Sequence, residues 1–118
     1  MIASAVYSTH NYESMRKQNA KSAYLKGKAD IVFEFTPNDI DNEFKEENKV
    51  ILSNKRGAGL WLWKPYIINK ALSLINDGDY LIYSDAGSLY VNKIVHLVDA
   101  LEMSGQDIMV FELPLISK

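Results

Sequence analysis

The sequence has no cysteine among its 118 residues. That absence excludes disulfide bonds, thiolate metal sites and cysteine nucleophiles, and it suits a reducing compartment such as the cytoplasm. Long hydrophobic runs are also missing, since residues 1–12 are apolar only briefly and no basic region precedes the apolar part. This segment is therefore neither a signal peptide nor a membrane span. We expect a cytoplasmic protein without a membrane span, and any attachment to the inner membrane would run through a partner.

An excess of basic charge is lacking as well. Thirteen Lys and Arg residues stand against 15 Asp and Glu residues, for a net charge of −2. Without a broad basic face, nucleic-acid binding is not expected. The two histidines share no spacing with each other or with a carboxylate that would indicate a zinc site or a triad, so His96 receives no role. The length and the ordinary 47% hydrophobic content predict a single globular domain over residues 1–118.

Short apolar runs alternate with amphipathic segments along the chain. The apolar runs predict strands at residues 2–7, 31–35, 80–83 and 108–111. The amphipathic segments predict helices at residues 12–26, 39–53, 65–75 and 94–103. This alternation predicts an α/β fold of the Rossmann-like type, with a mostly parallel sheet and helices on both faces.

The first expected helix and the third expected strand each have a further feature in the sequence. The first helix places Tyr12, Met15, Ala23 and Tyr24 on one face, and Gly27 follows where a glycine C-cap would end it. The run at 80–83 is continuously apolar, as is typical of a central parallel strand.

Ligands of open parallel sheets bind beyond the carboxyl ends of the strands. Three polar loops follow the expected strands, at 8–10, 36–38 and 84–87. In the third loop, Asp85 supplies a carboxylate, and the small residues Ala86 and Gly87 would let a ligand or metal approach the backbone. The alternative is that Asp85 only caps the turn after a buried strand, which aspartate also favours.

The segment between the second and third expected helices combines cations with aromatic rings. Arg56 and Lys64 flank a glycine-containing loop and the tryptophans Trp61 and Trp63. These residues could supply positive charge to a phosphate and an aromatic wall to a base or sugar. The alternative is that both tryptophans belong to the core and Lys64 is a solvated charge.

Two segments of the chain are similar to a known family: residues 56–68, RGAGLWLWKPYII, and residues 77–87, DGDYLIYSDAG. They resemble a family of bacterial glycosyltransferases associated with capsular or surface polysaccharide synthesis, and a looser similarity runs along the whole chain. The resemblance implies the nucleotide-binding half of a GT-A-like transferase, without the second half that binds the acceptor. It also implies a nucleoside-diphosphate sugar as donor, a saccharide as acceptor, and Mn²⁺ or Mg²⁺ at the diphosphate.

The same resemblance assigns residues to the donor site. Asp85 stands where the first aspartate of an aspartate-any-aspartate metal motif would stand, but Gly87 replaces the second aspartate. Arg56 and Lys64 match positions for diphosphate contacts, while Thr9 and Tyr12 lie where the first loop of such folds approaches the nucleotide. The resemblance leaves the catalytic base unassigned.

Two other readings of the same pattern stay open. A non-catalytic α/β module could use the fold for assembly, for example as a homodimer through an open sheet edge. A flavodoxin-like or receiver domain shares the alternation, but residues 8–11 contain no glycine to cradle a phosphate.

Overall fold

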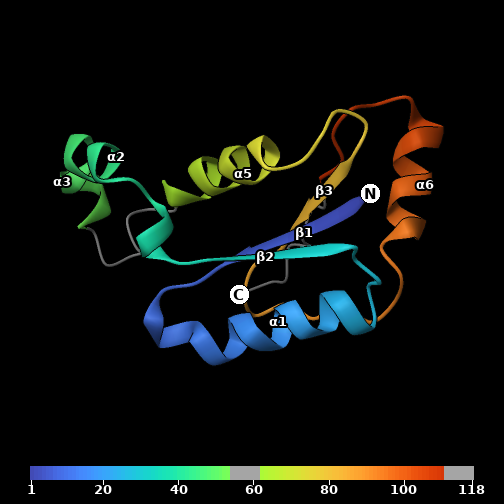
Figure 1. Ribbon diagram of the computed structural model, residues 1–118, viewed down its shortest axis with the longest axis horizontal. Helices are drawn as coiled ribbons and strands as arrows, with labels where there is room; N and C mark the ends of the chain where they lie inside the picture. Colours follow the sequence, from blue (N-terminus) through green and yellow to red (C-terminus); the bar gives the residue numbers. More distant parts are fainter. Residues whose placement is uncertain (54–61, 111–118) are drawn as a thin grey trace, which may run out of the picture.

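The computed structural model describes residues 1–53 and 62–110, and its centre is a parallel sheet (Figure 1). Three strands form it in the order β2-β1-β3: β1 (Ile2–Tyr7), β2 (Ile31–Phe35) and β3 (Tyr80–Tyr83). Both pairings are parallel. The predicted α/β fold with a parallel sheet is confirmed. Among the described residues, β1 is the central strand, and β3, which was predicted to be central, pairs with β1 alone.

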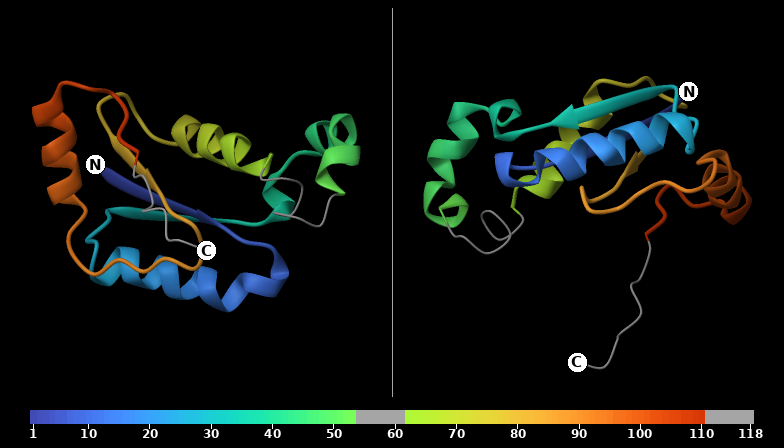
Figure 2. Two further views of the ribbon diagram at one scale, coloured as in Figure 1. Left: turned by 180° about the vertical axis from the view of Figure 1, so that it is seen from behind. Right: turned by 90° about the horizontal axis from the view of Figure 1, so that it is seen from below.

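The sequence of β1 explains its central position. Every residue from Ala3 to Tyr7 is buried, and the strand consists mainly of small side chains, which allow helices to approach from both sides. Helix α1 (Glu13–Leu25) covers one face and α5 (Trp63–Ser73) covers the other (Figure 2). Helices on both faces of the sheet are therefore confirmed.

The apolar core lies between α5 and the sheet. Its buried members are Ala5, Tyr7, Phe35, Ile40, Trp63, Ile67 and Ala71. The rings of Tyr7 and Trp63 stack with their centroids 4.2 Å apart. Trp63 is only 8% exposed, so the reading of this tryptophan as a core residue is confirmed. Trp61 lies outside the described residues.

The face beneath α1 carries polar side chains as well as apolar ones. Helix α1 bonds there to Ser8 and Ser84 at the strand ends and to Glu34 of β2. The helix residues buried against the sheet are Arg16, Asn19, Ala20 and Ala23. Of the four residues predicted to share one face of this helix, only Ala23 is buried, and Tyr12, Met15 and Tyr24 are all exposed. The polar residues that α1 buries bond to the polar side chains of this sheet face, and the large apolar residues of α1 are exposed.

Gly27 follows α1 for a reason other than the predicted one. The left-handed backbone conformation occurs at Lys28, with φ of 57°, and not at Gly27. A Cβ at Gly27 would stand 2.7 Å from the carbonyl oxygen of Ala23 and 3.0 Å from Cδ1 of Ile94. Gly27 is thus required by close packing.

The predicted helix at 39–53 is divided into two short helices, α2 (Asn42–Glu47) and α3 (Lys49–Leu52). The 3-10 turn η2 (Pro37–Asp39) precedes them. Thr36 and Asp39 form a reciprocal capping box around η2, and the Asp41 side chain accepts from the Phe44 amide at the start of α2. These polar side chains satisfy the backbone locally, which favours separate turns over one continuous helix.

The last described segment differs from its prediction. Helix α6 (Val95–Ser104) ends as predicted at Gly105, whose φ is 69°. Residues 108–110 do not form the predicted strand, and Ile108 and Val110 are 78% and 83% exposed. Phe111 lies outside the described residues. Among the helices described, not one has the length and apolar character needed to cross a membrane.

Candidate functional site

The carboxyl ends of the three strands lie at one edge of the sheet, as predicted. The Ser8 amide donates to the Phe35 carbonyl at 3.2 Å, and the Ser84 amide donates to the Ala5 carbonyl at 3.2 Å. These bonds extend the sheet pairing into the loops that follow β1 and β3. We call this edge, formed by residues 8–12, 36–39 and 84–88, the rim.

Asp85 projects from the rim and meets a cation there. Its side chain is 67% exposed, and its Oδ1 lies 3.3 Å from Nζ of Lys64 in the first turn of α5. The same ammonium lies 5.7 Å from the ring centroid of Tyr83 and 5.9 Å from that of Trp63. The structure therefore brings together two of the predicted site residues, Lys64 and Asp85, next to the aromatic rings of Tyr83 and Trp63.

The phenol of Tyr83 is part of this arrangement. Its hydroxyl donates to Asp85 Oδ1 at 3.5 Å. Burial first, and then the negative charge of Asp85, raise the pKa of Tyr83 well above its ordinary value. Tyr83 therefore stays protonated at neutral pH and remains a donor toward the carboxylate.

The turn after β3 does not use the Asp85 side chain. The Ser88 amide donates to the main-chain carbonyl of Asp85 at 2.9 Å. A capping aspartate would accept that bond with its carboxylate. The turn-capping alternative thus loses its support, and the carboxylate faces Lys64 and solvent.

A buried amide on α1 holds the backbone of the same loop. Asn19 is 1% exposed, and its Nδ2 lies 2.8 Å from Ser84 Oγ, 3.3 Å from the Asp85 carbonyl and 2.8 Å from the Ser88 carbonyl. Reasoning from the sequence missed this residue. The signal was present, because Arg16, Asn19 and Ala23 follow the i, i+3, i+7 spacing of one helix face.

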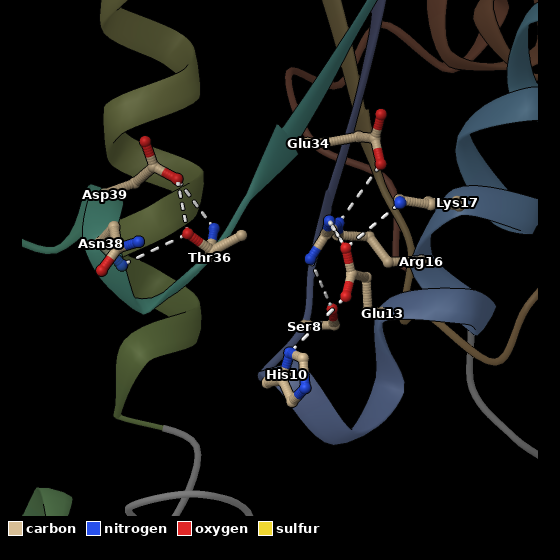
Figure 3. A network of polar contacts seen from close by, with 9 residues as sticks. All are labelled: Ser8, His10, Glu13, Arg16, Lys17, Glu34, Thr36, Asn38 and Asp39. Carbon is tan, nitrogen blue, oxygen red and sulfur yellow. Dashed lines mark hydrogen bonds and ion pairs between the residues drawn. The ribbon is translucent and has the colours of Figure 1, made fainter.

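A second polar network fixes the loop after β1 (Figure 3). Arg16, 8% exposed, donates from Nη1 to Ser8 Oγ at 3.0 Å and from Nε to Glu34 Oε1 at 3.2 Å. The Glu13 carboxylate lies 3.2 Å from Nζ of Lys17 and 3.6 Å from Nδ1 of His10. The hydrogen bond and charge of Lys17 hold the pKa of Glu13 below its usual range. Both networks anchor α1 to the rim.

The other predicted site residues have mixed positions. Thr9 is half-buried and precedes the 3-10 turn η1 (His10–Tyr12), while Tyr12 is 55% exposed at the start of α1. In the described ranges, no hydrogen bond or ion pair joins either residue to Asp85. Ala86 and Gly87 lie in the Asp85 loop, where a Cβ at Gly87 would meet Cε of Met15 at 3.3 Å. Arg56 lies outside the described residues.

The donor atoms around Asp85 do not fit a divalent cation. Mg²⁺ and Mn²⁺ prefer several oxygen ligands, and Gly87 offers no side chain. The neighbour of the Asp85 carboxylate is the ammonium of Lys64, which repels a cation. Within residues 1–53 and 62–110, no group of three or more potential metal-ligating side chains is found. Metal binding at Asp85 stays a prediction that this donor set does not support.

Two hollows on the described surface lie away from Asp85. Both follow the outer side of α1, and the larger one runs between Lys17, Lys21 and Tyr24 of the helix and the outer edge of β2. Neither includes Asp85 or Lys64. We base the candidate site on the paired charges at the rim, because the hollows on α1 are shallow and open.

Comparison with known proteins adds no relative to this description: no family model, no curated protein and no solved structure matches the chain.

Proposed function

We propose that this chain is a glycosyltransferase, or the donor-binding part of one, that moves a sugar from a nucleoside-diphosphate sugar to a saccharide acceptor. The observation that carries the proposal is the pairing of Asp85 and Lys64 at the carboxyl edge of a parallel sheet. Sheets of this kind bind ligands at that edge. The resemblance of residues 56–68 and 77–87 to surface-polysaccharide transferases supplies the donor class.

The two charges suit two parts of such a donor. Lys64 lies in the first turn of α5, where the helix dipole adds to its positive charge, so a diphosphate would be favoured there. Asp85 accepts hydrogen bonds only, which suits the hydroxyls of a ribose or a sugar. Tyr83 and the buried Trp63 give this contact an aromatic floor.

The chemistry proposed is displacement at the anomeric carbon. The acceptor oxygen forms a bond to that carbon, the bond to the diphosphate oxygen breaks, and the diphosphate leaves with the electron pair. Lys64 would stabilise the negative charge that develops on the leaving group. A transferase of this kind also needs a base for the acceptor hydroxyl, and the proposal assigns that role to no residue of this chain.

The test is a melting experiment with uridine and guanosine diphosphates. At ten times its dissociation constant, a ligand stabilises the folded state by about 1.4 kcal/mol. In a chain of this size that energy corresponds to about 4–8 °C in Tm. The shift should vanish in Asp85→Ala and persist in Asp77→Ala, a control at an exposed acid on the opposite edge of the sheet.

Manganese and a chelator form the second arm of that experiment. Since Lys64 occupies the place of a cation, we expect the shift to be the same with Mn²⁺ and with EDTA. A shift that needs Mn²⁺ would restore the metal site implied by the resemblance. No shift with either diphosphate, with or without Mn²⁺, would contradict the proposed function.

One set of observations favours a second candidate, a non-catalytic assembly module. The outer edges of β2 and β3 have no strand partner in the described part of the chain, and Val91 and Met103 are 87% and 89% exposed. Exposed edges and apolar side chains favour association. This candidate predicts a concentration-dependent oligomer without hydrolysis of nucleoside-diphosphate sugars, which sedimentation and a hydrolysis assay on one sample would reveal.

A further inference from the structure

We propose that Asn19 is a positioning residue for the rim. It fixes the loop at 84–88, and through that loop it sets the direction in which Asp85 meets Lys64 and a ligand. The effect of Asn19 on ligand binding rests on the proposed function, whereas its effect on the loop is independent of that function. The two effects are therefore measured separately.

The geometry of the amide determines its orientation. Two of its three neighbours are the carbonyl oxygens of Asp85 and Ser88, which can only accept hydrogen bonds. The nitrogen of Asn19 must therefore face the loop, and its two protons serve three oxygens. Ser84 Oγ, the third neighbour, is itself 3.2 Å from the hydroxyl of Tyr90.

The contacts bracket Asp85 on both sides. Asn19 donates to the Ser84 hydroxyl just before Asp85, to the main-chain carbonyl of Asp85 and to the carbonyl of Ser88 at the end of the turn. With the backbone held at these points from the α1 side, the Asp85 side chain is left to project toward α5, where Lys64 lies. A buried donor that meets this many acceptors is costly to lose, because the carbonyls are then left without their partner.

Packing of the helix alone would favour a different residue, because alanine and leucine have better helix propensity and bury no polar group. Asn19 is instead fully buried in the middle of the helix, and its side-chain amide donates hydrogen bonds to one loop, 65 to 69 residues away in sequence. The neighbouring Ser22 adds to this attachment, since its Oγ accepts from the Tyr90 amide at 2.9 Å.

The experiment compares Asn19→Ala with Asn48→Ala. Asn48 also donates its side-chain amide to a backbone carbonyl, that of Phe44 at 2.9 Å, but it lies between α2 and α3. Amide hydrogen exchange is measured over residues 84–90 and over β1 as an internal reference. Titration calorimetry with uridine diphosphate and guanosine diphosphate is done on the same samples.

We expect Asn19→Ala to raise exchange at 84–90 relative to β1 by about tenfold and to weaken the bound diphosphate by about tenfold. Asn48→Ala should do neither. Unchanged exchange at 84–90, or an equal rise in β1, would overturn the positioning role. If the wild type binds neither diphosphate, the proposed function fails, but the exchange measurement still decides the role of Asn19.

Asn19→Asp provides a second variant should Asn19→Ala fail to fold. Its carboxylate cannot donate to the loop, whereas its protonated form can donate one hydrogen bond. Burial beside three oxygen atoms would raise the pKa of this carboxyl above the ordinary Asp value of about 3.9. Loop protection and affinity, each divided by the wild-type value at the same pH, should therefore recover as the pH falls from about 8 to about 4. A ratio that does not change with pH would contradict the proposal.

Discussion

Nζ of Lys64 lies 3.3 Å from Oδ1 of Asp85, and this contact joins the first turn of α5 to the loop after β3. The Asp85 side chain is 67% exposed, so solvent screens the pair and its contribution to stability is small. Under the proposed function, the pair contributes to ligand binding more than to folding.

The first prediction follows from that contrast. Lys64→Ala should lower the free energy of unfolding by less than about 1 kcal/mol. It should weaken uridine or guanosine diphosphate by about tenfold or more, because a charged hydrogen bond to phosphate is lost. Urea unfolding and calorimetric titration measure the two effects. Lys21→Ala, at an exposed position on α1, is the control and should leave the affinity unchanged.

The second prediction concerns the pair of residues after α1. Gly27→Ala should destabilise the fold by about 1–3 kcal/mol, because the added methyl group would clash with the backbone oxygen of Ala23. Lys28→Gly should instead be neutral or slightly stabilising, since Lys28 already has φ of 57°. Urea unfolding of both variants provides the measurement. A neutral Gly27→Ala would mean that α1 and Ile94 are not packed as described.

The third prediction is an alkaline loss of stability. Burial raises the pKa of Tyr83 above its ordinary value of 10.0, so the folded chain keeps a proton that the unfolded chain loses above pH 10. The stabilisation is complete below pH 10 and falls as the pH rises further. Burial also raises the pKa values of Tyr7 and Tyr90. Tyr83→Phe should therefore reduce this loss without abolishing it.

Unfolding in urea at about pH 8 and about pH 10.5 measures the slope. Tyr24→Phe, at a position 63% exposed, is the matched control and should keep the wild-type slope. An unchanged slope in Tyr83→Phe would show that this phenol titrates alike in the folded and unfolded chains.

The parts of the fold that could be predicted are those with local signals. The apolar run at 2–7 and the helix before Gly105 depend on near neighbours in the sequence, and both are found. The carboxyl edge follows from the alternation of strands and helices, so the place of Asp85 could be predicted too.

The parts that could not be predicted depend on distant partners. Asn19 is informative only once the loop at 84–88 is known to lie against α1, and the inward face of α1 depends on the polar side chains of a sheet face far away in sequence. Likewise, the side-chain composition of 80–83 is compatible with both a central and an edge strand, and only the pairing decides between them.

The most direct test of a donor site at the rim is a nuclear magnetic resonance titration of the labelled protein with uridine diphosphate and guanosine diphosphate. For at least one of the two, we expect amide shifts to concentrate at 84–88, at 8–12 and around Lys64, with α6 and the turn at 76–79 unchanged, and we expect Asp85→Ala to remove them. Shifts along α1 and the outer edge of β2, or none with either nucleotide, would contradict the account.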